Sequence, residues 1–173
     1  MKKLIALFAA IVLVSSLTST VKAQTQGVTT TATGSATIVT TLAIAKSADM
    51  NFGSIAVNAT AGTVVLLPAG TRSATGGVTL QGTGTGVAAA AFNVTGLIGA
   101  TYTITLPSTY TITRQTGTET MTVNGFNSTP STTGTLSSSG AQTVAVGATL
   151  NIVGGQVPGT YTAAGFPVTV NYN

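Results

Sequence analysis

Side chains that could carry out chemistry are few in this sequence and are spread thinly along it. Of the 173 residues, six are Lys or Arg and two are Asp or Glu, and the chain contains no His and no Cys. Without imidazole and thiolate groups, the chain lacks the commonest general base, the thiol nucleophile and the usual ligands of zinc, copper and iron–sulfur clusters. The sequence therefore predicts no metal site, no cofactor and no disulfide bond.

The two acidic residues are the one pair that could act in acid–base chemistry, in the manner of the two carboxylates of a glycosidase. They are Asp49 and Glu119, far apart in a chain of which only 5% of the residues are charged. A soluble domain usually carries about 25% charged residues, and two carboxylates in the whole chain leave little for acid–base chemistry. We expect both to be surface residues, and we predict that the protein is not an enzyme and has no catalytic residue.

The N-terminal region has the features of a secretory signal peptide. Two lysines precede an apolar run, residues 4–14, and the polar stretch that follows ends on the small residue Ala23. This order of residues is typical of an export signal, and the apolar run is too short for a membrane-spanning helix, which needs about 20 residues. We predict that residues 1–23 are removed and that the protein is exported through the periplasm to the cell surface or the extracellular space.

Removal of the predicted signal peptide also removes most of the positive charge. The formal net charge falls from +4 to +1, because three of the six basic residues lie in residues 1–23. The remaining cations are isolated, whereas phosphate binding requires clustered Lys and Arg. We expect no nucleic-acid partner and, since no later segment is long and apolar enough, no transmembrane segment in the exported chain.

Apolar and polar residues alternate along most of the exported chain. The alternation is regular in residues 101–106 and in the C-terminal segment, where Phe166, Val168, Val170 and Tyr172 share one face. Shorter alternating segments occur at 110–113, 121–123, 144–146 and 150–152, and turn signals rich in Gly occur at 68–70, 76–77, 124–125 and 154–155. Such segments, rich in Val, Ile, Thr and Tyr, are typical of half-buried strands. The predicted fold is all-β, an antiparallel sandwich over residues 37–173.

Two segments differ in composition from the predicted strands. Residues 24–36 form a Thr-rich N-terminal extension, and residues 128–140, rich in Ser, Thr and Gly, are expected to be a solvated loop. The even-numbered positions of the extension stay in phase with the first predicted strand; they are Val28, Thr30, Ala32, Gly34 and Ala36. In an extended conformation these five side chains would point to the same side.

The order of several short motifs resembles that of an uncharacterised family of exported bacterial proteins. The motifs are NFGSI at 51–55, AGTVVL at 61–66, GGVTL at 76–80, FNVTG at 92–96, ATYTITL at 100–106, GQVPGTYT at 155–162 and VTVNY at 168–172. The resemblance covers nearly all of the exported chain. More loosely, the sequence is similar to spore coat U-like proteins and to fimbrial subunits of the chaperone–usher class, which are incomplete immunoglobulin-like sandwiches.

The looser similarity implies an immunoglobulin-like, pilin-like sandwich and a way of assembling. Fimbrial subunits lack one strand, and an N-terminal extension of the next subunit fills the open groove by strand addition. On this resemblance, the donor strand would comprise Val28, Thr30, Ala32, Gly34 and Ala36, with Gly34 as the glycine that donor strands usually carry. The acceptor edge would comprise Phe166, Val168, Val170 and Tyr172, with Tyr172 as the penultimate aromatic. The chain departs from many pilins in having no Cys, and its donor positions are smaller and more polar than usual.

We therefore expect a secreted structural protein of the cell surface, a fimbria- or pilus-like subunit that assembles by β-strand addition. The partners would be further copies of this chain or related subunits, and the resemblance also implies a periplasmic chaperone and an usher. The alternative is a monomeric extracellular binding module, adhesive or carbohydrate-binding, that uses loops such as residues 128–140. The scarcity of charge favours assembly, because exposed sheet edges are commonly protected from pairing by charged residues, Lys especially.

Overall fold

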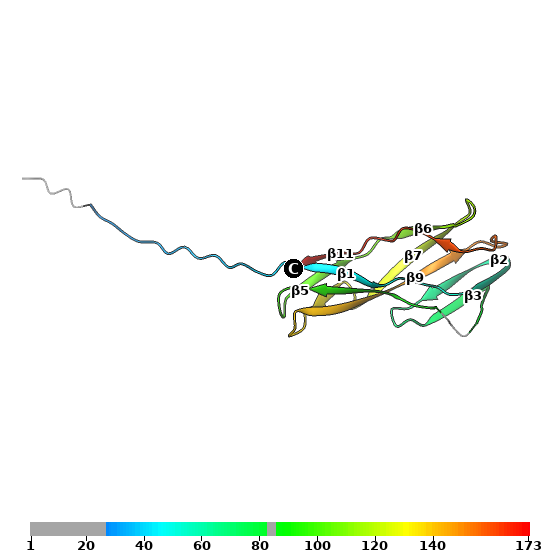
Figure 1. The fold of residues 1–173 in the computed structure, drawn as a ribbon, viewed down its shortest axis with the longest axis horizontal. Coiled ribbons are helices and arrows are strands. Elements are labelled where there is room, and N and C mark those ends of the chain that lie inside the picture. The colour runs from blue at the N-terminus through cyan, green and yellow to red at the C-terminus, as the bar shows by residue number, and fades with distance from the viewer. Residues whose placement is uncertain (1–26, 83–85) are drawn as a thin grey trace, which may run out of the picture. The chain divides into compact units, whose positions relative to one another are not determined.

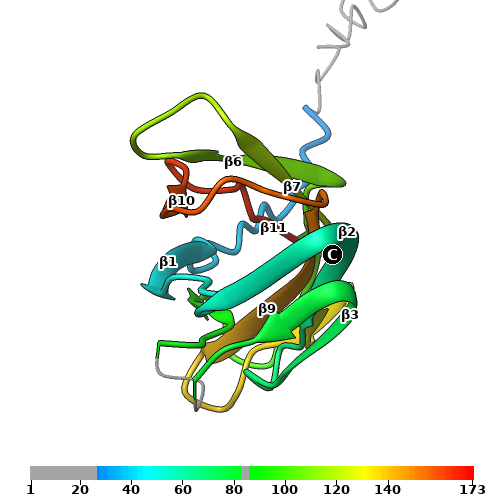
Figure 2. The ribbon, with the colours of Figure 1, turned by 90° about the vertical axis from the view of Figure 1, so that its right-hand side faces the viewer.

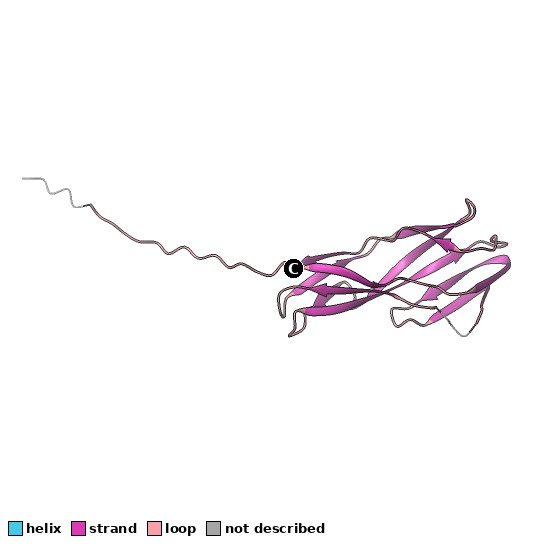
Figure 3. Cartoon of the chain, in the orientation of Figure 1, coloured by secondary structure: helices cyan, strands magenta, loops and turns pink. Residues whose placement is uncertain are grey.

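The computed structural model describes residues 27–82 and 86–173, and these residues contain strands and turns but no helix. The predicted signal peptide, residues 1–23, lies outside the described residues. The chain divides into two units, Met1–Thr37 and Ile38–Asn173. In the first unit, residues 27–37 have no regular secondary structure and are exposed to solvent. The second unit holds all of the described strands (Figure 1; Figure 3).

Eleven strands make up the second unit. In chain order they are β1 (Ala43–Ala48), β2 (Ile55–Leu66), β3 (Arg72–Leu80), β4 (Ala90–Thr95), β5 (Thr101–Thr105), β6 (Thr109–Arg114), β7 (Thr120–Thr129), β8 (Thr133–Thr135), β9 (Ala141–Ile152), β10 (Tyr161–Thr162) and β11 (Thr169–Tyr172). All pairings between these strands are antiparallel. The alternation of β5 is the clearest, since Tyr102 and Ile104 are buried while the threonines between them are exposed.

The strands form a large curled sheet and a small one, which confirms the predicted antiparallel β-sandwich. The large sheet has the order β1-β4-β9-β7-β6-β10, with β2 pairing both β9 and β3, and the small sheet has the order β11-β5-β8. Figure 2 shows the paired strands β2 and β3 side by side. The long strand β9 lies in the middle of the large sheet. Its first half pairs with β4 and its second half with β2.

The interior contains two apolar clusters. The first surrounds Tyr102, which is fully buried and whose hydroxyl donates a hydrogen bond of 2.7 Å to Oε1 of Gln142. Burial raises the pKa of Tyr102 above its ordinary value, because the charged phenolate would lose its hydration. The second cluster surrounds Val64 and Leu150. The ring of Phe126 packs against both clusters and joins them.

Proline residues lie at some of the places where the chain passes from one sheet to the other. Pro107 separates β5 in the small sheet from β6 in the large sheet, and Pro130 separates β7 in the large sheet from β8 in the small sheet. Proline has no N–H to donate to a strand pairing, so a continuous alternating sequence is divided into two strands at these points.

The structure corrects two of the predictions made from composition. The prediction of a solvated loop at residues 128–140 is wrong, because β8 lies inside it and Leu136 is only 2% exposed. Gly134 has no Cβ and therefore leaves room for the ring of Tyr102 beneath it. The turns predicted at 76–77 and 124–125 are also wrong: both glycine sites lie within strands near irregularities of pairing, where Gly76 and Gly125 adopt positive φ. The turns at 68–70 and 154–155 are confirmed.

Candidate functional site

The C-terminal strand β11 forms one edge of the small sheet. It pairs with β5 on one side, and in the described part of the chain no strand pairs with its other side. Earlier in the C-terminal segment, β10 pairs with β6, so this segment pairs in turn with the two strands on either side of Pro107. The segment between β10 and β11, residues 163–168, belongs to no strand.

The strand that was predicted over residues 166–172 thus begins only at Thr169. The pairing of Thr169 with Thr105 explains why, because continuing this register by two residues places Pro167 opposite Pro107. Neither proline has an N–H, so the two positions cannot exchange the hydrogen bonds of an antiparallel pair. The strand pairing is interrupted at this point, although the inward alternation of side chains continues through Val168 and Phe166.

The direction of the backbone groups on β11 follows from one hydrogen bond. The N–H of Asn173 donates a hydrogen bond of 3.2 Å to the carbonyl oxygen of Thr101. Thr101 is the residue of β5 that lies opposite Asn173 when the register of the two strands is continued by one residue. Hydrogen-bonded and non-hydrogen-bonded pairs alternate along an antiparallel ladder. The backbone groups of Asn171 and Thr169 therefore face β5, whereas those of Val170 and Tyr172 face the free edge. The alternation also requires the N–H of Ile104 to face away from β11. It does, because this N–H donates a hydrogen bond of 2.7 Å to the carbonyl oxygen of Thr132 on the other side of β5.

Side chains next to the free edge are only half-buried, in contrast to the rest of the core. Phe166, Val168, Val170 and Tyr172 all pack against the first cluster, and each remains partly exposed. Leu42, just before β1, and Ile44, within it, pack against the same cluster and are also half-buried. Fully buried neighbours such as Val94 and Val144 lie beneath them. The core is therefore incompletely covered along this side of the sandwich.

Tyr172 connects the end of β11 to the segment that precedes β1. Its hydroxyl donates a hydrogen bond of 2.9 Å to the carbonyl oxygen of Thr40 and accepts one of 2.7 Å from the N–H of Leu97. Gly96 lies directly against this hydroxyl, where a Cβ would clash with it. The start of β1 and the end of β11 are thereby held together at one end of the sandwich.

An open groove lies between the end of β1 and the segment that precedes β11; we name it the edge groove. It has a volume of about 480 Å³ and is lined by Lys46, Ala48, Asp49, Met50, Ala90, Phe92, Ala164, Gly165, Phe166 and Pro167. Its walls are mostly apolar, and the two charged residues form an ion pair with each other, with Nζ of Lys46 2.6 Å from Oδ1 of Asp49. The edge groove therefore offers an apolar site without an unpaired charge.

The ring of Phe166 is the central contact of the edge groove. Its centroid lies 4.9 Å from that of Phe126, 5.9 Å from that of Tyr110 and 6.2 Å from that of Phe92, in tilted or edge-to-face geometries. The N–H of Gly165 donates to the hydroxyl of Tyr110 at 2.6 Å and anchors the neighbouring backbone. These contacts hold an aromatic wall in place on an otherwise irregular segment.

The two carboxylates occupy separate ion pairs. Asp49 pairs with Lys46, and Glu119 pairs with Arg114, with Nη1 of Arg114 3.3 Å from Oε2 of Glu119. Hydrogen bonding from its own backbone N–H and from Arg114 lowers the pKa of Glu119. A lowered pKa means that this carboxylate stabilises the fold above its unfolded pKa, and that the contribution is lost as the pH falls through the folded pKa. Among the described residues, no group of three or more His, Cys, Asp or Glu could hold a metal ion.

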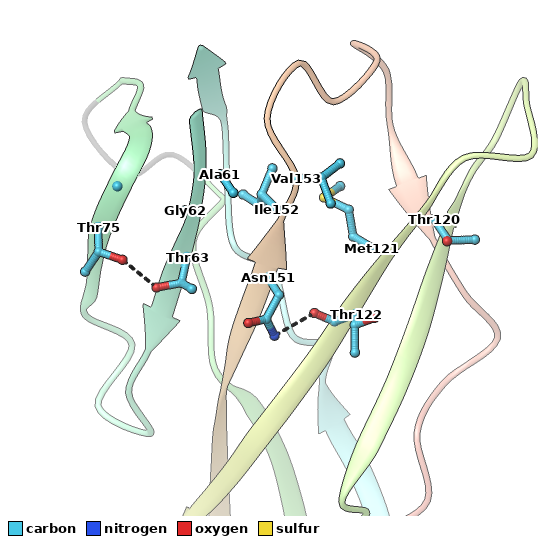
Figure 4. A pocket seen from close by; sticks show the side chains of 11 residues that line it. Ala61, Gly62, Thr63, Thr75, Thr120, Met121, Thr122, Asn151, Ile152 and Val153 are labelled. Atoms are coloured by element: carbon cyan, nitrogen blue, oxygen red, sulfur yellow. Dashed lines mark hydrogen bonds between the residues drawn. The ribbon is translucent and has the colours of Figure 1, made fainter. Parts of the chain in front are cut away.

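A second hollow, of about 570 Å³, lies where β2, β3, β7 and β9 come together (Figure 4). Its lining is uncharged and includes threonine hydroxyls and one amide. The hydroxyls of Thr63 and Thr75 lie 2.8 Å apart, and Nδ2 of Asn151 donates to the carbonyl oxygen of Thr122 at 3.1 Å. This hollow has the chemistry of a weak site for neutral polar molecules.

The predicted donor positions and the predicted acceptor positions lie in different units of the chain. Val28, Thr30, Ala32, Gly34 and Ala36 are exposed and belong to no strand, and Val28 is 97% exposed. The acceptor positions line the free edge of β11 and the edge groove. The β1 side of this groove, which includes Met50 and Phe92, is not predictable from the sequence, because no local pattern reveals that β1 lies opposite the C-terminal segment.

Comparisons with known proteins give one match. A family model described as "Domain of unknown function (DUF4402)" matches residues 42–172, which is most of the second unit. No curated protein and no solved structure matches the chain. In the part of the chain that the structure describes, no helix is long and apolar enough to cross a membrane.

Proposed function

Because the chain belongs to the family described as Domain of unknown function (DUF4402), whose description names no activity, we propose a function from the molecule itself. The protein is an exported, structural subunit of the cell surface that assembles into fimbria-like filaments by β-strand addition. The observation that carries this proposal is the free edge of β11 beside a core that is only half covered. An exposed edge of this kind is a template for an added strand.

The occupant that we propose is the N-terminal extension, residues 24–36, of a second copy of the chain. Its described part is exposed, carries no charge and presents Val28, Thr30, Ala32, Gly34 and Ala36 at alternate positions. Nine residues, 28–36, span about 30 Å as a strand, and the seven residues of the acceptor edge, 166–172, span about 23 Å. The extension is therefore long enough to cover the whole edge.

Backbone pairing and apolar burial together would stabilise the docked strand. The outward N–H and C=O groups of Val170 and Tyr172 offer about four hydrogen bonds, each with a net contribution of about 1 kcal/mol. Covering the half-buried side chains of the edge adds roughly 25 cal/mol for each Å² of apolar surface removed from water. The missing strand of an immunoglobulin-like sandwich would be supplied in this way.

The direction of the chain favours docking between copies over docking within one copy. Tyr172 holds Thr40 beside the end of β11, so the chain upstream of Thr40 would run parallel to β11 if it followed its own free edge from that end. The extension of a second copy is free to enter antiparallel to β11, and antiparallel pairing is slightly more stable for each residue. Such a contact is head-to-tail and propagates into a filament.

Electron microscopy of the exported chain, beginning at Gln24, tests this proposal. We expect unbranched filaments of uniform width, and size-exclusion chromatography of the same sample is expected to show a ladder of oligomers. A protein that stays monodisperse at high concentration and shows no filaments would contradict the proposal.

The alternative function is a monomeric binding module for neutral carbohydrate. The hollow in Figure 4 favours it, because threonine hydroxyls and the amide of Asn151 suit the hydroxyl groups of a sugar. Binding of the monodisperse protein to a panel of glycans would support this alternative.

A further inference from the structure

We propose that Ile38 of one copy is the anchor residue of the contact and inserts into the edge groove of the next copy, beside Phe166. This inference rests on the proposed assembly function and adds a residue that the predicted donor positions, Val28 to Ala36, do not include. Ile38 would be the part of the occupant that enters the apolar groove between β1 and the C-terminal segment.

Ile38 is an isoleucine that the isolated chain leaves in water. The residue is 98% exposed, whereas the next residue, Val39, is 52% exposed. Ile38 also continues the even-numbered series of the extension, so that in an extended strand it points to the same side as Gly34 and Ala36. A large β-branched apolar side chain at this position suits a strand that becomes buried on docking.

The direction of docking places Ile38 at the edge groove. In a strand antiparallel to β11, the C-terminal residues of the donor lie farthest from Tyr172 and closest to Phe166. If Ile38 stands opposite Phe166, then Ala36, Gly34 and Ala32 stand opposite Val168, Val170 and Tyr172 in that order. The small donor residues, Ala and Gly, thus lie opposite Val168, Val170 and Tyr172, whose half-buried side chains leave little room for a large side chain.

The size and chemistry of the edge groove fit one large aliphatic side chain together with its backbone. Met50, Ala90, Phe92 and Phe166 provide apolar walls within its volume of about 480 Å³. The charges at its rim, Lys46 and Asp49, neutralise each other at 2.6 Å. An aliphatic side chain that enters therefore meets no unpaired charge, whereas an aspartate at the same place would be placed in an apolar groove without a partner.

The test compares Ile38→Asp with the matched control Val39→Asp, in the chain that begins at Gln24. Both substitutions add the same charge one residue apart, and the residue at 38 is exposed, so circular dichroism is expected to show an unchanged fold. We expect Ile38→Asp to raise the protein concentration needed for polymer formation at least tenfold, and Val39→Asp to change it less than twofold. Equal polymerisation by Ile38→Asp and the unchanged chain, or equal losses in both variants, would overturn the inference.

A mixing experiment separates a lost anchor from a damaged groove. Ile38→Asp keeps an intact acceptor groove, so it should cap growing filaments and shorten those formed by the unchanged chain. A variant that neither polymerises nor shortens filaments would show damage to the acceptor side and would overturn the inference. If Ile38→Asp polymerised normally but removal of the extension still abolished polymers, the anchor role of Ile38 would be wrong and the assembly proposal would stand. Failure of the anchor inference is therefore distinguishable from failure of the assembly proposal.

Discussion

A chain that begins at Thr37, and so lacks residues 24–36, is expected to fold as a monomer and to form no polymers. The domain from Ile38 onwards contains all of the described strands and both apolar clusters, so its fold does not depend on the extension. The free edge of β11 would then have no donor strand to receive. Polymers of the intact chain should resist SDS without heating, because both backbone pairing and apolar burial hold each contact.

Gel electrophoresis of unheated samples measures this result, and thermal unfolding by circular dichroism provides the control for folding. We expect the intact chain to give a ladder of bands and the shortened chain to give one band, with a cooperative unfolding transition. Polymers formed equally well by the shortened chain would show that another surface carries the assembly.

Val170→Pro is expected to abolish polymer formation while the domain remains folded. The N–H of Val170 faces away from β5, so proline there removes a donor from the free edge and leaves the pairing of Asn171 with Thr103 intact. Proline is tolerated on edge strands where the missing N–H faces outward. Loss of part of the packing of Val170 against the first cluster should cost about 1–2 kcal/mol of unfolding free energy.

The matched control is Asn171→Pro, one residue away and with the opposite direction of its N–H. This substitution removes a hydrogen bond to β5 and should destabilise the domain by about 1–3 kcal/mol. Chemical denaturation measures both free energies, and gel electrophoresis of unheated samples measures polymers. If Val170→Pro polymerised normally, or if it were less stable than Asn171→Pro, the assignment of the free edge would be wrong.

Much of the fold follows from local patterns that are visible in the sequence. The alternation in residues 101–106 predicts β5 and its buried Tyr102, because the two faces of a strand repeat every second residue. The pattern was misleading at glycines 76 and 125, which lie within strands and not at turns, because strand irregularities use the same backbone conformation as turns. The buried Leu136 escaped prediction because a single apolar residue among serines and threonines has no periodicity.

The acceptor positions of the candidate site follow from the sequence, but the groove beside them does not. Phe166, Val168, Val170 and Tyr172 alternate over a short stretch, so their shared face is a local property. Met50 and Phe92 join them only because β1 pairs with β4 and lies across from the C-terminal segment, which is a long-range property. The interruption at Pro167 likewise requires knowledge of the register that places Pro107 opposite it.

The scarcity of charged residues leaves the free edge of β11 without the protection that sheet edges usually have. Exposed edges in most proteins carry charged residues, especially Lys, that prevent pairing with other chains. On β11 there is no charged residue, and beside it the side chains of Lys46 and Asp49 are engaged with each other. An edge without such protection suits a protein whose edge is filled by a neighbouring copy.

The most direct test of the account is the binding of a synthetic peptide, residues 27–39, to the chain that begins at Thr37. Isothermal titration calorimetry is expected to show saturable binding of one peptide to each domain, with no binding to the Val170→Pro variant of the same chain. The peptide should also protect the N–H groups of Val170 and Tyr172 from hydrogen exchange. A peptide that does not bind, or that binds equally well to the Val170→Pro variant, would contradict assembly by strand addition at β11.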